Sequence, residues 1–143
     1  MYERLVYVSR AAASVKAPDA YDIIRVSLNR NSRYGLTGAL ILIDGYFLQV
    51  LEGDTYQVRE RFERIATDAR HTDVELRQSA RIPHLGFADE WMALRHDDEV
   101  THAVRDAFGY APGFPADRLD GDRLVAFALA CCRAQAEDLQ SMP

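Results

Sequence analysis

Hydrophobic and polar residues alternate at the start of the chain and then change period. Residues 3–10 are rich in β-forming types, and their alternation places Leu5, Tyr7 and Ser9 on one face of a predicted strand. The next apolar stripe has helical spacing and predicts a helix over residues 20–31. The chain is therefore expected to begin with a strand followed by a helix.

Two apolar segments joined by a turn signal come next. Residues 36–43 form a continuous apolar run, which is typical of a buried strand, and Asp44-Gly45 is a two-residue signal for a tight hairpin. Residues 46–53 are predicted to return antiparallel. Alternation places three side chains of this returning strand on one face: Phe47, Gln49 and Leu51.

A second helix and two further strands are predicted after this hairpin. Asp54, with Gln57 three residues later, resembles a capping box, and an apolar stripe continues the helix to about Ala69. Strands are expected at about 74–83 and 91–95, on either side of a polar turn.

The resulting order of elements, βαββαββ, predicts an α+β fold with a ferredoxin-like sheet and two helices on one face. Residues 1–96 would form this domain, and residues 97–143 would form a C-terminal helical extension. Helices are expected in the extension at about 98–108 and 119–139. The second of them has an apolar stripe that should pack on the open face of the sheet or on another subunit.

Composition narrows the class of protein. The chain has 143 residues, of which 48% are hydrophobic, and this is enough for one domain with a real core. A formal net charge of −5 without a Lys/Arg stripe argues against nucleic-acid binding. No apolar run approaches the roughly 20 residues of a membrane span. The first residues show no secretory signal, so we expect a cytoplasmic protein.

The two cysteines do not indicate a disulfide or a metal site. Cys131 and Cys132 are adjacent in a predicted helix, where neighbouring side chains point in different directions. No Cys/His cluster has the spacing of a metal site. We therefore expect both cysteines to fill space in the helix and predict no bound metal.

Three polar residues fit poorly into the predicted core. Gln49 lies between two apolar side chains of its strand, and a buried amide needs partners for its donors and its acceptor. Tyr7 lies mid-strand among aliphatic residues, and Asn31 lies near the end of the first helix. Each has an ordinary explanation: a face partly open to water, a core tyrosine, and a helix terminator. Together they can also converge between sheet and helices, as a small-molecule site requires.

The residues around these positions form several short motifs with a distinctive order and spacing along the chain. The longest runs from Asn31 to Gly38 as NSRYGLTG and continues from Asp44 to Gly53 as DGYFLQVLEG. Tyr7-Val8-Ser9 precedes it, and Asp68-Ala69-Arg70-His71 follows the second helix as a D-x-R-H motif. In order and register these blocks resemble the BLUF domains, which are flavin-dependent blue-light sensors. The resemblance covers about two thirds of the chain, over residues 2–95.

The resemblance implies a flavin held over the sheet between the two helices: FAD, with FMN or riboflavin as alternatives. Tyr7 would be the photochemical electron and proton donor, and Gln49 would lie between the phenol and the N5/O4 edge of the flavin. The other residues expected at the cofactor are Ser9, Ile24, Ser27, Arg30, Asn31, Phe47, Asp68, Arg70 and His71. Arg70 and His71 also have a structural explanation, because cations in a last helical turn complement the helix dipole.

The residue types suit a light-driven switch. An amide has a donor end and an acceptor end, so rotation or tautomerisation of Gln49 reverses its hydrogen-bond pattern with little change in volume. A new donor aimed at the flavin O4 would lower the excitation energy. The expected signature is a red-shifted absorption spectrum with an intact cofactor.

The fifth strand departs from the family pattern. The family has a tryptophan and a methionine two residues apart, and Met92 matches the methionine. Glu90 occupies the tryptophan position, and Trp91 follows one residue later. Alternation turns Trp91 away from the pocket face unless a bulge intervenes. We therefore expect the signal to leave through strand five, Met92 and the following helices.

Other functions remain open at this stage. Residues 97–143 show no effector pattern, so we expect a non-enzymatic photoreceptor that self-associates and acts on an unknown downstream protein, as short members of the family do. A flavin-dependent oxidoreductase would need a nicotinamide site, and the sequence has no Gly-rich dinucleotide loop. A light-blind flavin- or ligand-binding interaction module is the other alternative.

Overall fold

The computed structural model describes residues 1–12, 34–88, 93–96, 99–109 and 119–141, with side chains of the last segment described as far as Arg133. The helix predicted at 20–31 lies outside the described residues. So do four of the predicted cofactor residues, Ile24, Ser27, Arg30 and Asn31, and the proposed relay residues Trp91 and Met92.

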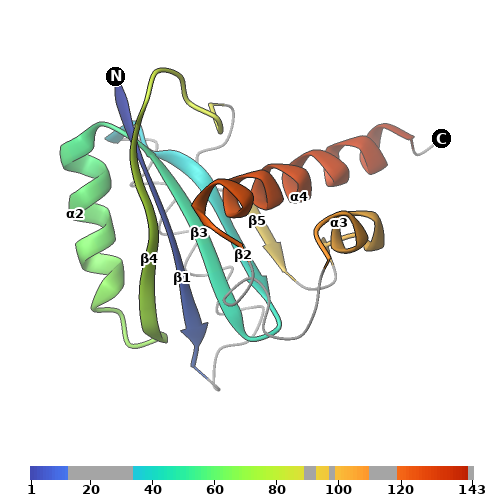
Figure 1. Cartoon of the computed structure of the whole chain (residues 1–143), viewed down its shortest axis with the longest axis horizontal. Coiled ribbons are helices and arrows are strands. Elements are labelled where there is room, and N and C mark those ends of the chain that lie inside the picture. Colours follow the sequence, from blue (N-terminus) through green and yellow to red (C-terminus); the bar gives the residue numbers. More distant parts are fainter. Residues whose placement is uncertain (13–33, 89–92, 97–98, 110–118, 142–143) are drawn as a thin grey trace.

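One five-stranded sheet organises the chain (Figure 1). Its strands are β1 (Tyr2–Ala11), β2 (Thr37–Ile43), β3 (Tyr46–Gly53), β4 (His71–Ile82) and β5 (Ala93–His96), in the spatial order β4-β1-β3-β2-β5. All neighbours are antiparallel except β2 and β5, which are parallel. The order of the first four strands is ferredoxin-like, with β5 added at one edge, and this confirms the predicted α+β fold.

The predicted hairpin is confirmed at β2 and β3. Asp44 and Gly45 have φ angles of 53° and 79°, as the tight turn that matches strand twist requires. Gly38 allows the backbones of β2 and β3 to lie close together, because a Cβ at this position would lie 1.8 Å from the Val50 carbonyl oxygen. The two strands can therefore pair along their whole length.

Helix α2 (Thr55–Ala66) begins as predicted but ends earlier than predicted. Asp54 caps it by accepting the backbone N–H groups of Tyr56 and Gln57. At the other end Thr67 donates its N–H to Arg64 O, and the chain turns away. The expected continuation to Ala69 was wrong for this reason.

The early end of α2 also moves the start of the next strand. Strand β4 begins at His71 and not at about 74. The described part of β5 covers Ala93–His96, and the start predicted at 91 lies outside the described residues. Arg70 and His71 are consequently outside the last turn of α2. The explanation that placed their charges inside that turn was wrong.

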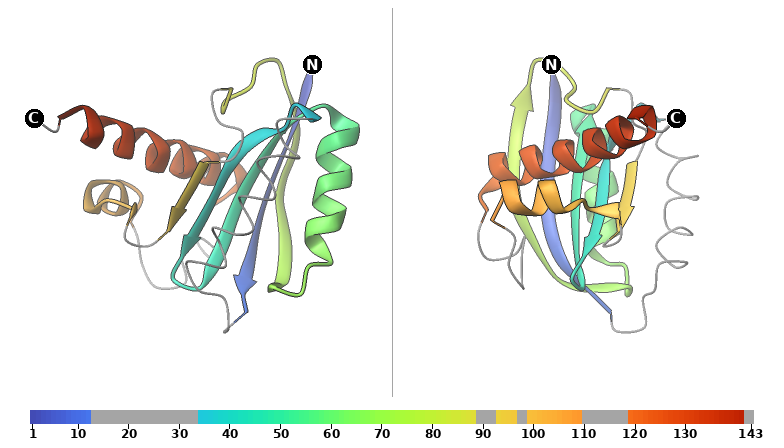
Figure 2. Two further views of the ribbon diagram at one scale, coloured as in Figure 1. Left: turned by 180° about the vertical axis from the view of Figure 1, so that it is seen from behind. Right: turned by 90° about the vertical axis from the view of Figure 1, so that its right-hand side faces the viewer.

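The two faces of the sheet carry separate apolar cores, as the strand alternation predicted. The face toward α2 contains Leu5, Leu36, Leu40, Phe47, Leu51 and Val58. The opposite face includes Val6, Val8, Leu48 and Val50 and is covered by α3 (His102–Ala107) and α4 (Gly121–Ser141). Figure 2 shows α2 and α4 on opposite sides of the sheet.

Helix α4 buries the stripe that its sequence predicted. Leu124, Phe127 and Ala128 are fully buried against the sheet. Of the two sites expected for this helix, the open face of the sheet is the one that the structure shows. The described residues of α3 and α4 therefore share a core with the strands.

The cysteines act as space-filling residues of α4, as predicted. Both are buried and not disulfide-bonded, and burial raises the pKa of the Cys131 thiol to about 12. A thiol with this pKa stays protonated and unreactive near neutral pH. None of the helices in the described part of the chain is long and apolar enough to cross a bilayer.

Candidate functional site

Tyr7 and Gln49 meet directly on the face of the sheet toward α2. They are register partners in the antiparallel pair of β1 and β3, so their side chains leave the sheet side by side. The Tyr7 hydroxyl donates a hydrogen bond to Gln49 Oε1. Both residues are buried, with exposed fractions of 2% and 6%. The carbonyl oxygen of the buried Gln49 amide thus finds a hydrogen-bond donor in a phenol that is distant in the sequence.

The surroundings of Tyr7 keep its phenol neutral. Burial raises the pKa of Tyr7 well above its usual value, and the negative charge of Asp68 raises it further. The ring lies 5.6 Å from the Phe62 ring and 6.0 Å from the His71 ring, measured between centroids. Tyr7 therefore holds its proton near neutral pH in a mostly aromatic environment.

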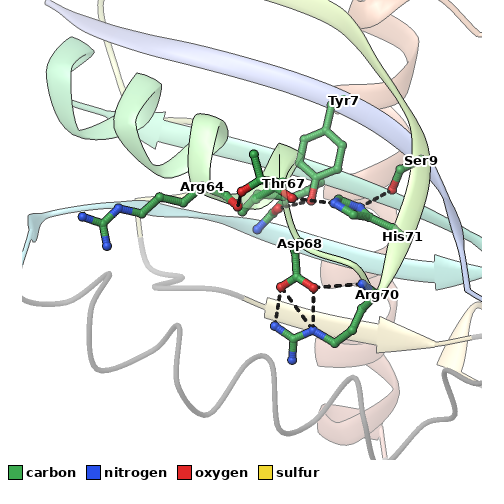
Figure 3. A network of polar contacts seen from close by, with 9 residues as sticks. Tyr7, Ser9, Arg64, Thr67, Asp68, Arg70 and His71 are labelled. Carbon is green, nitrogen blue, oxygen red and sulfur yellow. Dashed lines mark hydrogen bonds and ion pairs between the residues drawn. The ribbon is translucent and has the colours of Figure 1, made fainter.

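His71, the first residue of β4, is fixed at both ring nitrogens (Figure 3). Its Nδ1 lies 2.8 Å from Ser9 Oγ, and its Nε2 lies 2.6 Å from the carbonyl oxygen of Ile65. The His71 and Phe47 rings form a T-shaped pair, with 6.1 Å between their centroids and an interplanar angle of 76°. His71 thus joins β1, β3 and the end of α2 beside the tyrosine.

The pairing of β1 with β4 is irregular next to these residues. The register shifts between Val6 and Tyr7 and again between Val8 and Arg10. Asp73, in β4 opposite the second shift, has a φ angle of 55°. Bulges of this kind re-aim side chains near functional sites, and here they flank Tyr7 and Ser9.

Asp68 and Arg70 form an ion pair at the rim of the cluster (Figure 3). Arg70 Nε lies 2.9 Å from Asp68 Oδ1, and the backbone N–H of Arg70 donates to the same oxygen at 2.9 Å. The Arg70 side chain is 48% exposed, and the Asp68 side chain is 32% exposed. Hydrogen bonds from Arg70 hold the pKa of Asp68 below its usual value.

This ion pair gives an expected pH dependence. The lowered pKa of Asp68 contributes stability above the unfolded pKa of about 4, and that contribution is lost as the pH falls through the folded pKa. Because both groups are partly exposed, it should not exceed about 1 kcal/mol. An NMR titration should place the Asp68 midpoint below the usual value, and Arg70→Gln should move it back. An unchanged midpoint in Arg70→Gln would contradict the assignment.

The structure brings together the predicted site residues that it describes. Tyr7, Gln49, Ser9, His71 and Phe47 form one connected cluster, with Asp68 and Arg70 beside it. Phe62 was not among the predicted site residues, although its ring packs against Tyr7. Its place on the apolar stripe of α2, four residues after Val58, was the available signal.

The chemistry of the cluster fits a flavin. A flavin ring is flat and aromatic with a polar edge of nitrogen and carbonyl groups, and it needs apolar walls and amide donors. The described residues supply aromatic rings at Phe47 and Phe62, and a carboxamide at Gln49 that carries two N–H donors. Arg70 adds a cation at the rim. These are the types of group that hold and orient such a ring.

Comparison with protein families gives a match over most of the chain. A family model described as BLUF, sensors of blue-light using FAD, matches residues 2–93. The photoactivated adenylate cyclase subunit beta of Euglena gracilis is 32% identical over 96 residues. This alignment covers 67% of the chain and 11% of the relative, so the chain spans about a tenth of the length of that relative.

Solved structures agree with the family match. The BLUF protein BlrB in its dark state has a TM-score of 0.73 and 27% identity, over 93% of this chain and 96% of BlrB. BlsA in its ground state has a TM-score of 0.80 and 25% identity, over 92% and 87% of the respective chains. The similarity to both structures therefore extends beyond the 93 N-terminal residues into the C-terminal part.

Proposed function

The chain belongs to the BLUF family of blue-light sensors that use a flavin, and from this premise we propose that Tyr7 and Gln49 are its photoactive pair. The observation that carries the proposal is the buried hydrogen bond from the Tyr7 hydroxyl to Gln49 Oε1. It joins an oxidisable phenol to a group that can donate and accept. The remaining steps follow from what these two side chains can do.

Tyr7 is suited to release an electron and a proton together. The bound flavin supplies a strong oxidant when it absorbs blue light. The phenol is protonated before light arrives, because burial raises its pKa, and a phenol that has lost an electron is strongly acidic. Its proton already points at Gln49 Oε1, so the amide is the first acceptor within reach.

Gln49 converts this event into a lasting change. Rotation or tautomerisation of its side chain exchanges the donor and acceptor ends, and it needs almost no extra volume in a packed site. The altered amide would present a new donor toward the polar edge of the cofactor. This step accounts for the expected red shift.

The proposed cofactor is FAD, and its binding residues extend beyond the described part of the chain. Phe47 would form a wall, and Arg70, supported by Asp68, would meet the polar edge of the ring. Ile24, Ser27, Arg30 and Asn31 are further members of the proposed set.

The strand register supports a route from the amide to β5. Leu40 is the register partner of Gln49 in β2, and Leu94 is the partner of Leu40 in β5. Both leucines belong to the core on the Gln49 side of the sheet. Ala93, the preceding residue of β5, belongs to the core under α4. A shift of β5 would thus change the packing on both faces of the sheet. We propose that Met92 takes part in this shift.

We propose that the C-terminal helices pass the signal to a separate protein and that the chain self-associates. The Euglena relatives are adenylate cyclases by name, but the chain covers only about a tenth of their length. Helix α4 is the element best placed for output, since it lies across the sheet that carries the photoactive pair.

Illumination of the purified protein tests this function directly. The protein loaded with FAD should be yellow, and blue light should produce a small red shift that reverses in the dark. Bleaching that depends on NAD(P)H would instead indicate an oxidoreductase. A colourless protein that gains no colour with added flavin would indicate a light-blind module.

A further inference from the structure

The hydrogen-bond chain through His71 has a defined direction. The Ile65 carbonyl oxygen can only accept, so the hydrogen of the 2.6 Å bond must be on His71 Nε2. In the neutral ring Nδ1 is then an acceptor, and the Ser9 hydroxyl donates to it at 2.8 Å. The chain runs from Ser9 through the imidazole to the end of α2.

Both ring nitrogens are therefore used within the protein. Ser9 is 2% exposed and His71 is 8% exposed, so water does not compete strongly for these bonds. An imidazole in this state has no N–H left to offer to a flavin. The predicted contact of Ser9 and His71 with the cofactor would require these two hydrogen bonds to break.

The geometry points to Ser9 and His71 as positioning residues for Tyr7, which act without touching the flavin. This inference rests on the proposed function, because Tyr7 is the group that they position. Ser9 follows Tyr7 by two residues on the same face of β1. The hydrogen bond at Ser9 therefore holds the imidazole ring beside the phenol ring in a T-shaped arrangement, with 6.0 Å between the centroids and an interplanar angle of 76°.

The orientation of the phenol ring determines where its hydroxyl points. His71 and Phe62 both contact the Tyr7 ring, and Phe47 contacts His71. If Ser9 no longer donates, the imidazole loses one of its two fixed points and can rotate. The Tyr7 ring would then sample more orientations, and the hydrogen bond to Gln49 would be made less of the time. Dark recovery should respond, because it depends on re-forming this bond.

A pair of substitutions at Ser9 tests the inference. Ser9→Ala removes the donor, and Ser9→Thr keeps a hydroxyl on a side chain suited to a strand. We expect Ser9→Ala to bind FAD as tightly as the parent protein and to change the dark-recovery rate by about fivefold, the factor that one buried hydrogen bond represents. Ser9→Thr should restore the parent rate. A loss of FAD affinity in Ser9→Ala with an unchanged recovery rate would identify Ser9 and His71 as ligands and overturn the inference.

NMR of the unsubstituted protein gives a test that does not depend on how the variants fold. In protein labelled with ¹⁵N at its four histidines, the signal of His71 can be assigned by comparison with His71→Gln. His71 should be the Nε2–H tautomer without flavin and should keep that tautomer when FAD is added. A tautomer change on adding FAD would show that the ring turns to the cofactor, which would overturn the inference.

The proposed function and the positioning role of Ser9 and His71 can be disproved separately. Absence of any reversible red shift in the parent protein would remove the proposed function. A normal red shift in the parent, with the same recovery rate in Ser9→Ala, would remove only the positioning role.

Discussion

Replacing Tyr7 by phenylalanine should abolish the reversible red shift and leave the flavin bound. The substitution removes one oxygen atom from a ring that is 2% exposed, so the aromatic packing against Phe62 and His71 remains. It removes the hydrogen bond to Gln49 and, with it, the only proton that the proposal moves. Loss of a proton-transfer group costs about 10²–10⁴-fold, so the yield of the shifted species should fall by at least about 10²-fold.

The measurement is the absorbance difference before and after a blue flash, made at equal flavin occupancy. Tyr46→Phe is the matched control, because Tyr46 lies on β3 three residues before Gln49 but faces the other side of the sheet. Its hydroxyl accepts a bond from Arg10 at the surface and has no part in the proposed chemistry. A Tyr7→Phe protein that keeps a normal shift would contradict the proposed pair.

Replacing Glu52 by alanine should cost about 3–5 kcal/mol of unfolding free energy, the range measured when one partner of a buried ion pair is removed. Glu52 is fully buried and accepts two hydrogen bonds of 2.8 Å. One comes from Arg4 Nε on the paired strand, and the other from the backbone N–H of Phe87. The substitution would leave a guanidinium that is only 17% exposed and a buried N–H without this acceptor.

Urea unfolding of three variants separates the charge from the hydrogen bonds. Glu52→Gln keeps an acceptor for Phe87 but loses the charge, so its cost should be smaller, about 1–3 kcal/mol. Glu60→Gln is the surface control, because the Arg64–Glu60 pair on α2 is 63% and 37% exposed and should be worth below about 1 kcal/mol. If Glu52→Ala cost no more than Glu60→Gln, the buried pair would have no stabilising role.

The hydrogen bonds of Glu52 also connect β3 to the loop after β4. Glu52 lies three residues after Gln49 on β3 and holds the loop that follows β4. Gly86 belongs to this loop, and a Cβ there would lie 2.9 Å from Arg4 Nη2. The strand that carries the proposed switch is therefore tied to the connection between β4 and β5.

Local physical rules were sufficient for most of the elements. Alternation with period two located β1 and β3 and assigned their faces, because a strand with two unlike faces tolerates no slip. The Asp44-Gly45 turn and the Asp54 cap depend on the conformations of a few neighbouring residues, so they could be predicted as well. The resemblance to a family then selected Tyr7 and Gln49 from the polar residues of those faces.

The end of α2 shows where local rules fail. The apolar stripe continues to Ala69, yet the helix stops at Ala66, where Thr67 and the Asp68 carboxylate turn the chain into β4. Periodicity records which residues face the core but not where competing hydrogen bonds end the helix. As a consequence, His71 is not in a helical turn: it begins β4 and forms hydrogen bonds with Ser9 and Ile65.

The sequence alone determined the order of the described elements, the faces of the strands and the apolar stripe of α4, because each depends on residues close together in the chain. The family resemblance implied that Tyr7 meets Gln49, and only the tertiary structure decided that Ser9 meets His71 and that Arg4 meets Glu52. These partners are 42, 62 and 48 residues apart, respectively. Strand register and helix packing bring them together, and both depend on the whole core at once.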